Sequence, residues 1–219
     1  MTCHICGVII LPEITDMSAL TELYQQIALC HKCDIARLRT KVVPGEGAEN
    51  AEIIFIGEAP GWHEDQQGRP FVGQAGQFLD RLLISINLSR QQVYIANVIK
   101  CRPPDNRDPL PTEIQNCREW LDSQIDIIKP GMIVTLGRYS MARYFPGKSI
   151  SKIHGTAVKR DDIIYYAMYH PAAALHQQSL RQAIEADMQK IPKLLAESRS
   201  IQETRPQPPP AQQLNMFEV

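Results

Sequence analysis

No apolar run in this sequence approaches the roughly 20 residues that a membrane-spanning helix needs. The first residues also lack the basic segment and apolar stretch of a secretory signal peptide. We therefore expect a cytoplasmic protein without a membrane anchor. Its 219 residues suit one α/β domain with spare length at both ends, and we expect a monomer.

An excess of positive charge is missing as well. With 23 Lys and Arg against 24 Asp and Glu, the formal net charge is −1. Global charge therefore gives no sign of a nucleic-acid partner, and this balance counts weakly against one. Any contact with DNA must depend on a local basic patch, a helix amino terminus or backbone N–H groups.

Apolar runs alternate with stretches of helical spacing along the chain. The apolar runs predict buried strands over residues 52–57, 93–99, 132–136 and 163–168. The helical spacing of Leu and Ile predicts helices over residues 17–29, 78–86, 112–128 and 180–195. This alternation predicts a three-layer α/β/α fold with a central, mostly parallel four-stranded sheet. Ligands bind beyond the carboxyl ends of such strands, so we expect the site after Ile56, Ile95 and Met168.

Composition divides the chain into three parts. The predicted domain covers residues 17–197. Residues 198–219 include a proline-rich run that cannot pack a core, so a disordered tail is predicted there. Residues 1–16 hold Cys3 and Cys6 and little else. These two cysteines fit an unstructured terminus, a redox pair or half of a zinc site.

Six cysteines are many for a cytosolic protein, in which thiols are kept reduced. Close pairs there more often bind metal or carry out redox chemistry than form disulfides. Cys30 and Cys33 form one tight pair, whereas Cys101 and Cys117 lie far along the chain. Four such cysteines fit a [4Fe–4S] cluster or a tetrahedral zinc, and their spacing leaves both open beside four unrelated buried thiols.

Several motifs make the sequence recognisable. They are GEAPG at 57–61, GRPFVG at 68–73, NVIKCRPP at 97–104 and YHPAA at 169–173. Together with the order of the four cysteines, they resemble the family 4 uracil-DNA glycosylases. The resemblance implies an enzyme that hydrolyses the N-glycosidic bond of uracil in single- or double-stranded DNA. It would release uracil and leave an abasic site, which is the first step of base excision repair.

The resemblance also implies how a uracil flipped out of DNA is bound. Phe71 is expected to stack on the planar base. The Asn97 amide offers an acceptor for N3–H and a donor for O4, the opposite of what cytosine requires. His170 is expected to donate to O2 and so stabilise the negative charge on the departing uracil. Gly57 and Ala59 are expected to contact the substrate closely.

Ala59 distinguishes this chain from the best-known uracil glycosylases, and Ala174 departs from the family 4 pattern. Well-known uracil glycosylases have an Asp that positions the attacking water where this chain has Ala59. Glu58 is then the nearest carboxylate, expected to orient water or stabilise a cationic sugar, or else only to support the loop. The usual Leu four residues after the motif histidine is Ala174 here, which makes Leu175 the candidate DNA wedge.

By the same likeness, the cysteines at 30, 33, 101 and 117 hold a [4Fe–4S] cluster. Its role is expected to be structural, because hydrolysis of an N-glycosidic bond needs no electron transfer. Five basic residues near these cysteines are candidates for phosphate contacts, namely Arg37, Arg39, Lys41, Lys100 and Arg102. The alternatives are a non-catalytic iron–sulfur module that binds nucleic acid and a glycosylase of broader base range.

The last residues of the chain carry a separate motif. Gln213-Leu214-Asn215-Met216-Phe217 resembles the Gln-Leu-x-Leu-Phe peptide by which bacterial repair proteins dock on the DNA sliding clamp. Apolar residues on a flexible end commonly mark a docking peptide. We expect Leu214, Met216 and Phe217 to fill apolar pockets and Gln213 to provide a polar anchor. A chance match of five residues is the alternative.

Overall fold

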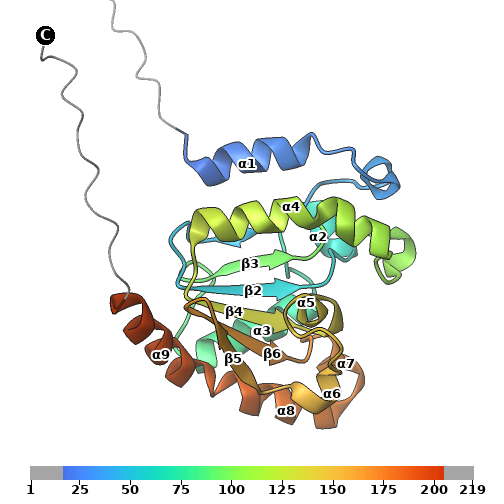
Figure 1. Ribbon diagram of the computed structural model, residues 1–219. Helices are drawn as coiled ribbons and strands as arrows, with labels where there is room; N and C mark the ends of the chain where they lie inside the picture. Colours follow the sequence, from blue (N-terminus) through green and yellow to red (C-terminus); the bar gives the residue numbers. More distant parts are fainter. Residues whose placement is uncertain (1–16, 205–219) are drawn as a thin grey trace, which may run out of the picture.

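Four parallel strands form the centre of the computed structural model, which describes residues 17–204 (Figure 1). They are β2 (Ile53–Gly57), β3 (Tyr94–Asn97), β4 (Met132–Leu136) and β6 (Ile163–Met168). Their order is β3-β2-β4-β6, and all three neighbouring pairs are parallel. Every residue of β2, β3 and β4 is buried, because helices cover both faces.

Two short strands extend the sheet at its edges. β1 (Glu46–Gly47) pairs antiparallel with β3, and β5 (Ala157–Arg160) pairs antiparallel with β6. The predicted α/β class is confirmed, but the predicted four strands are only the parallel part of a six-stranded sheet. The edge strands gave no apolar run, since β1 has two residues and β5 is partly exposed.

The alternation of side chains along β2 shows how the two outer layers are built. Ile54 and Ile56 pack in one core with α1 (Ala19–Ala28) and α4 (Pro111–Ile128). Ile53 and Phe55 pack in the other core with α3 (Gln74–Ser85), α8 (Gln178–Met188) and α9 (Ile191–Glu203). Successive strand residues point to opposite faces, so one apolar run supplies both cores. Figure 1 shows α1 and α4 on one side of the sheet and α8 and α9 on the other.

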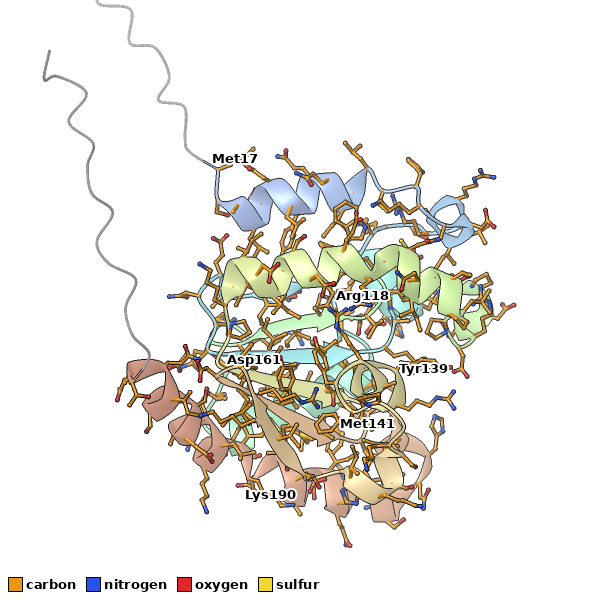
Figure 2. The ribbon with its side chains drawn as sticks, viewed as in Figure 1. Met17, Arg118, Tyr139, Met141, Asp161 and Lys190 are labelled. Carbon is orange, nitrogen blue, oxygen red and sulfur yellow. The ribbon has the colours of Figure 1, made fainter. Side chains whose placement is uncertain are left out.

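Short helical segments join these elements. They are η1 (Asp34–Arg37), α2 (Trp62–Gln67), η2 (Pro104–Asn106), α5 (Arg138–Tyr144), α6 (Ile150–Ile153) and α7 (Ala173–His176). Figure 2 shows Tyr139 of α5 at the carboxyl end of the parallel strands and Asp161 at the opposite end. The loops that matter below lie at the Tyr139 end.

The predicted helix over residues 180–195 is two helices. α8 ends at Met188 and α9 begins at Ile191, with Pro192 in its first turn, where no intrahelical N–H is needed. α9 then continues to Glu203, and its residue Ser198 is only 2% exposed. The packed structure therefore extends past residue 197, where the domain was predicted to end.

Both chain ends lie outside the described residues. The structure describes neither residues 1–16, which include Cys3 and Cys6, nor residues 205–219, which include the predicted clamp peptide. Within residues 17–204, none of the helices combines the length and the apolar character that crossing a membrane demands.

Candidate active site

The carboxyl ends of β2, β3 and β6 border one cavity, where the predicted topology placed the site. Its volume of about 430 Å³ lies within the range of about 300–1,000 Å³ found for ligand pockets. The lining residues are Ala59, Gly61, Glu64, Phe71, Ala75, Asn97, Asn106, His170, Ala172 and His176. The cavity thus brings together four residues that the motifs predicted, although they lie up to about a hundred positions apart in sequence. They are Ala59, Phe71, Asn97 and His170.

Asn97 ends strand β3 with an unpaired acceptor. The residue is 2% exposed, and its Oδ1 has no hydrogen-bond partner within the described part of the chain. A buried polar atom left without a partner costs about 1–3 kcal/mol. Such an atom in a cavity wall is available to accept a hydrogen bond from a bound ligand or from water.

Gly57 pairs with Asn97 in the sheet and makes room for it. A Cβ at residue 57 would lie 2.4 Å from Asn97 Oδ1 and 2.6 Å from the Phe71 ring. Both distances are far inside van der Waals contact, so only glycine fits here. Gly57 therefore leaves the space that Asn97 and Phe71 occupy, and its contact with a substrate stays a prediction.

Phe71 is held in a strained backbone conformation. Its φ of 53° lies in the left-handed region, which is unfavourable for a bulky side chain. Its carbonyl accepts a hydrogen bond from Arg90 at 3.0 Å, and a Cβ at Gly76 would come within 1.8 Å of the same oxygen. The Phe71 ring stacks on that of His170, with centroids 5.4 Å apart. Strain that the surroundings hold in place is common at functional sites.

His170 is a neutral hydrogen-bond donor in the cavity wall. Burial lowers its pKa to about 4. Its Nδ1 accepts a hydrogen bond from the backbone N–H of Ala172 at 3.1 Å, which assigns the ring proton to Nε2. Gly137, with φ 93°, lies against this residue, since a Cβ there would be 3.1 Å from that of His170.

Glu64 connects the motif at 57–61 with the motif at 68–73. One carboxylate oxygen accepts from the N–H groups of Val72 and Gly73 at 2.8 and 2.9 Å. The other accepts from the N–H of Gly61 at 3.1 Å. These bonds fix the loop that carries Phe71. Glu64 therefore lines the cavity and also stabilises its wall.

Glu58 lies beside the cavity but is not among the residues that line it. Burial and the nearby Asp108 carboxylate raise its pKa to about 7, while Arg138 opposes that shift. Asp108 and Arg138 form an ion pair with each other. Sequence reasoning missed both residues, because they follow different strands and belong to no motif. A carboxylate with a pKa near neutrality is suited to accepting a proton.

The segment after the histidine motif forms part of the cavity and its rim. Ala172 and His176 line the cavity, and Leu175, the candidate wedge, is 45% exposed on α7. Asn106 lines the cavity from the segment after β3. Asn106 and His176 had no predicted role, because no local pattern distinguishes them from surface residues.

The four cysteines predicted to bind a cluster line a second cavity. Cys30 and Cys33 lie between α1 and η1, Cys101 follows β3, and Cys117 lies within α4. Burial raises the pKa of Cys33 and Cys101 and raises that of Cys117 to about 12. Within residues 17–204, no group of three His, Cys, Asp or Glu side chains is placed to hold a single metal ion.

Three of the cysteine sulfurs accept N–H hydrogen bonds. The indole of Trp120 donates to Cys30 at 3.3 Å, and the guanidinium of Arg39 donates to Cys101 at 3.2 Å. The third bond, to Cys117, comes from a backbone N–H at 3.2 Å. Donors to sulfur stabilise thiolates and are a usual feature around iron–sulfur clusters.

Two of the basic residues predicted to contact phosphate point inward instead. Lys100 is 1% exposed, and its Nζ donates to the Asn97 carbonyl and to Gln124. The phosphate role predicted for Lys100 is therefore wrong. Arg39 donates to Cys101 and to the carbonyl of Ala28.

Comparison with known proteins places these features in a family. Residues 44–193 match the uracil DNA glycosylase superfamily. The type-4 uracil-DNA glycosylase of Sulfurisphaera tokodaii is 47% identical over 188 residues, covering 81% of this chain and 86% of the relative. The type-4 uracil-DNA glycosylases of Archaeoglobus fulgidus and Saccharolobus solfataricus are each 43% identical, over 81% and 82% of this chain and 94% and 88% of their own. The chain therefore belongs to the uracil-DNA glycosylase superfamily and to its type-4 members.

Proposed function

We propose that this protein hydrolyses the bond between uracil and deoxyribose in DNA, which releases uracil and leaves an abasic site for base excision repair. One observation carries the proposal: a buried Oδ1 of Asn97, without a hydrogen-bond partner among residues 17–204, in a cavity that also holds Phe71 and a neutral His170. Relatives that cover most of the chain are named type-4 uracil-DNA glycosylases, which supports the same activity.

Asn97 distinguishes uracil from cytosine in this proposal. Its Oδ1 accepts from uracil N3–H, and its Nδ2 donates to O4. Cytosine has an acceptor at N3 and a donor at N4. The acceptor Oδ1 would then face the acceptor N3, and the donor Nδ2 would face the N4 amine. A mismatch of this kind leaves buried polar groups unpaired, which is how a site rejects an analogue strongly. Phe71 supplies the apolar face on which the extruded base stacks.

His170 assists the departure of the base. As the bond between C1′ and N1 breaks, its electron pair leaves with uracil and negative charge develops at O2. The Nε2–H of a neutral His170 donates to this oxygen and lowers the barrier as the charge grows. The low pKa matters because the ring does not have to lose a proton before it acts at neutral pH.

Glu58 activates water in this proposal. The oxygen of a water molecule bonds to C1′, and its proton passes to the Glu58 carboxylate. Ala59 takes the place of the expected Asp and carries no group that competes for this role. On the rim, Leu175 is proposed to fill the space that the extruded nucleotide leaves, and the exposed Arg37 and Lys41 are proposed to contact phosphates.

The four cysteines are proposed to hold a [4Fe–4S] cluster. They line one cavity and come from three separate segments of the fold, and three of them accept N–H bonds that suit thiolates. When bound, the cluster supplies a structural crosslink between the segment after α1 and the segment after β3. It takes no part in the hydrolysis. Burial alone keeps Cys117 protonated, so metal binding has to displace its proton.

The first prediction tests the reaction. Wild type should convert a uracil-bearing oligonucleotide to an abasic product that alkali cleaves, whereas His170→Ala should bind this DNA with similar affinity. The rate constant for base release should fall by about 10²–10³ in the variant, the cost of losing one positioned donor to a developing oxyanion. An oligonucleotide with cytosine at the same position serves as the control. Binding by wild type without release of uracil would instead identify a non-catalytic DNA-binding module.

The second prediction concerns pH. Glu58 accepts a proton only when ionised, and its pKa is about 7. The single-turnover rate constant of wild type should therefore fall about tenfold per unit as pH decreases below about 7. His170 stays neutral down to about pH 4 and adds no decrease in this range. Glu58→Gln should be slow and show no such dependence. If wild type has the same rate from pH 5 to 8, Glu58 does not activate water.

The third prediction concerns the metal. Purified protein should be brown, absorb broadly near ~400 nm and contain about four irons per chain. Cys117→Ser should lower iron content and the yield of folded protein together, because it removes a ligand. Uracil release per iron-loaded molecule should change much less. Metal analysis that finds one zinc and no iron would rule out the cluster.

The fourth prediction concerns the tail, which lies outside the described residues. We propose that residues 213–217 dock on the sliding clamp of the host while the proline-rich segment lets the domain search DNA. A chain ending at Pro210 should lose measurable affinity for the clamp in a titration, yet release uracil at the wild-type rate. Equal affinity of both chains for the clamp, or no affinity of either, would eliminate this docking.

A further inference from the structure

Lys100 connects the base-reading side chain to the cysteine site. Its side chain is almost completely buried, at 1% exposure of the residue. Its Nζ donates to the backbone carbonyl of Asn97 at 2.9 Å and to Gln124 Oε1 at 2.6 Å. Its own backbone N–H donates to the sulfur of Cys117 at 3.2 Å. One residue thus contacts both functional regions. It lines the cavity of the cysteines but not the active-site cavity, and it is almost absent from the surface.

We propose that Lys100 is a positioning residue that fixes Asn97 for base reading, an inference that rests on the proposed function. Asn97 is the last residue of β3, where the ladder with β2 ends. Its carbonyl is bound by the Lys100 ammonium, so the orientation of the peptide that carries the reader depends on this bond. A bond from a charged donor is about twice as strong as a neutral one.

Discrimination by an amide needs a fixed orientation. An Asn97 side chain that rotates by half a turn about its last bond exchanges donor and acceptor, and then it matches cytosine as well as it matched uracil. A shift of the Asn97 backbone lowers the rate, because displacement of a catalytic or binding group by about 1 Å can cost about 10²-fold in rate. Lys100 therefore affects both the rate and the choice of base.

The second partner of Lys100 is itself fixed. Gln124 Nε2 donates to the Pro44 carbonyl and to the Tyr94 hydroxyl, each at 2.8 Å. These acceptors determine which end of the Gln124 amide is nitrogen, so Oε1 faces Lys100. The Tyr94 hydroxyl in turn lies 2.7 Å from that of Tyr24. The ammonium is therefore held between two acceptors that belong to rigid elements, β3 and α4.

A different role would make Lys100 only a counter-charge for cysteine thiolates. Both side-chain acceptors of Lys100 are uncharged, so its ammonium has no direct anionic partner in these two bonds. A buried charge is costly without compensation. A counter-charge role predicts loss of iron from a Lys100 variant, with base reading unchanged in molecules that keep their iron. Positioning predicts the reverse, and the two are separable by experiment.

The test is a double-mutant cycle with uracil-bearing oligonucleotides. It compares kcat/KM, per iron-loaded molecule, for wild type, Lys100→Met, Asn97→Ala and the double variant. Lys100→Met should lower kcat/KM about 10- to 100-fold in wild type and lower the ratio of uracil to cytosine release. It should have almost no effect in the Asn97→Ala background, because Lys100 acts through Asn97. Methionine keeps an unbranched side chain that is one heavy atom shorter, and it removes the donors together with their charge.

Tyr24→Phe is the matched control, since it removes a hydroxyl from the far end of the same network and should leave kcat/KM unchanged. If Lys100→Met does not accumulate as folded protein, Gln124→Leu replaces it in the cycle, because it frees the ammonium on one side. Equal losses in both Asn97 backgrounds, or iron loss with unchanged kcat/KM per loaded molecule, would overturn the inference alone. A wild type that releases no uracil would instead refute the proposed function.

Discussion

The close approach of β2 and β3 at their carboxyl ends is the constraint on which the cavity depends. Gly57 pairs with Asn97 in register, and a Cβ at residue 57 would overlap both the Asn97 amide and the Phe71 ring. The absence of one side chain therefore lets two others reach the same space. The second such place is Gly76, which allows the carbonyl of the strained Phe71 to lie against α3.

Burial assigns the charge states in the site. It lowers the pKa of His170 to about 4 and raises that of Glu58 to about 7, because it disfavours the charged form of either group. The usual order of the two pKa values is thereby reversed. Near neutral pH, the imidazole remains a donor and the carboxylate is poised to take a proton. Two groups whose environments push their pKa values apart are typical of acid–base assignments in active sites.

The active site and the cysteine site share one strand end. Asn97 closes β3, Lys100 turns back to hold its carbonyl, and Cys101 follows at once. The α4 helix supplies Cys117 to one site and Gln124 to the support of the other. A crosslink at the cysteines would therefore stiffen the segment that carries Asn97, although the cysteines do not line the active-site cavity.

The sequence by itself determined the layered fold and the central residues of the site. The strands at 132–136 and 163–168 have their predicted bounds, because strands covered on both faces must be apolar at nearly every position. Phe71, Asn97 and His170 were found from local motifs, and the cavity brings them together.

The tertiary structure alone decided which charged residues are buried and what they contact. The sequence suggested that Lys100 is a surface base, whereas its side chain is buried and donates to Gln124. Arg138 lies near Glu58 because the strands that precede these two residues pack side by side. Such contacts join residues far apart in the chain, so no local pattern encodes them, whereas periodicity and motifs are local by nature.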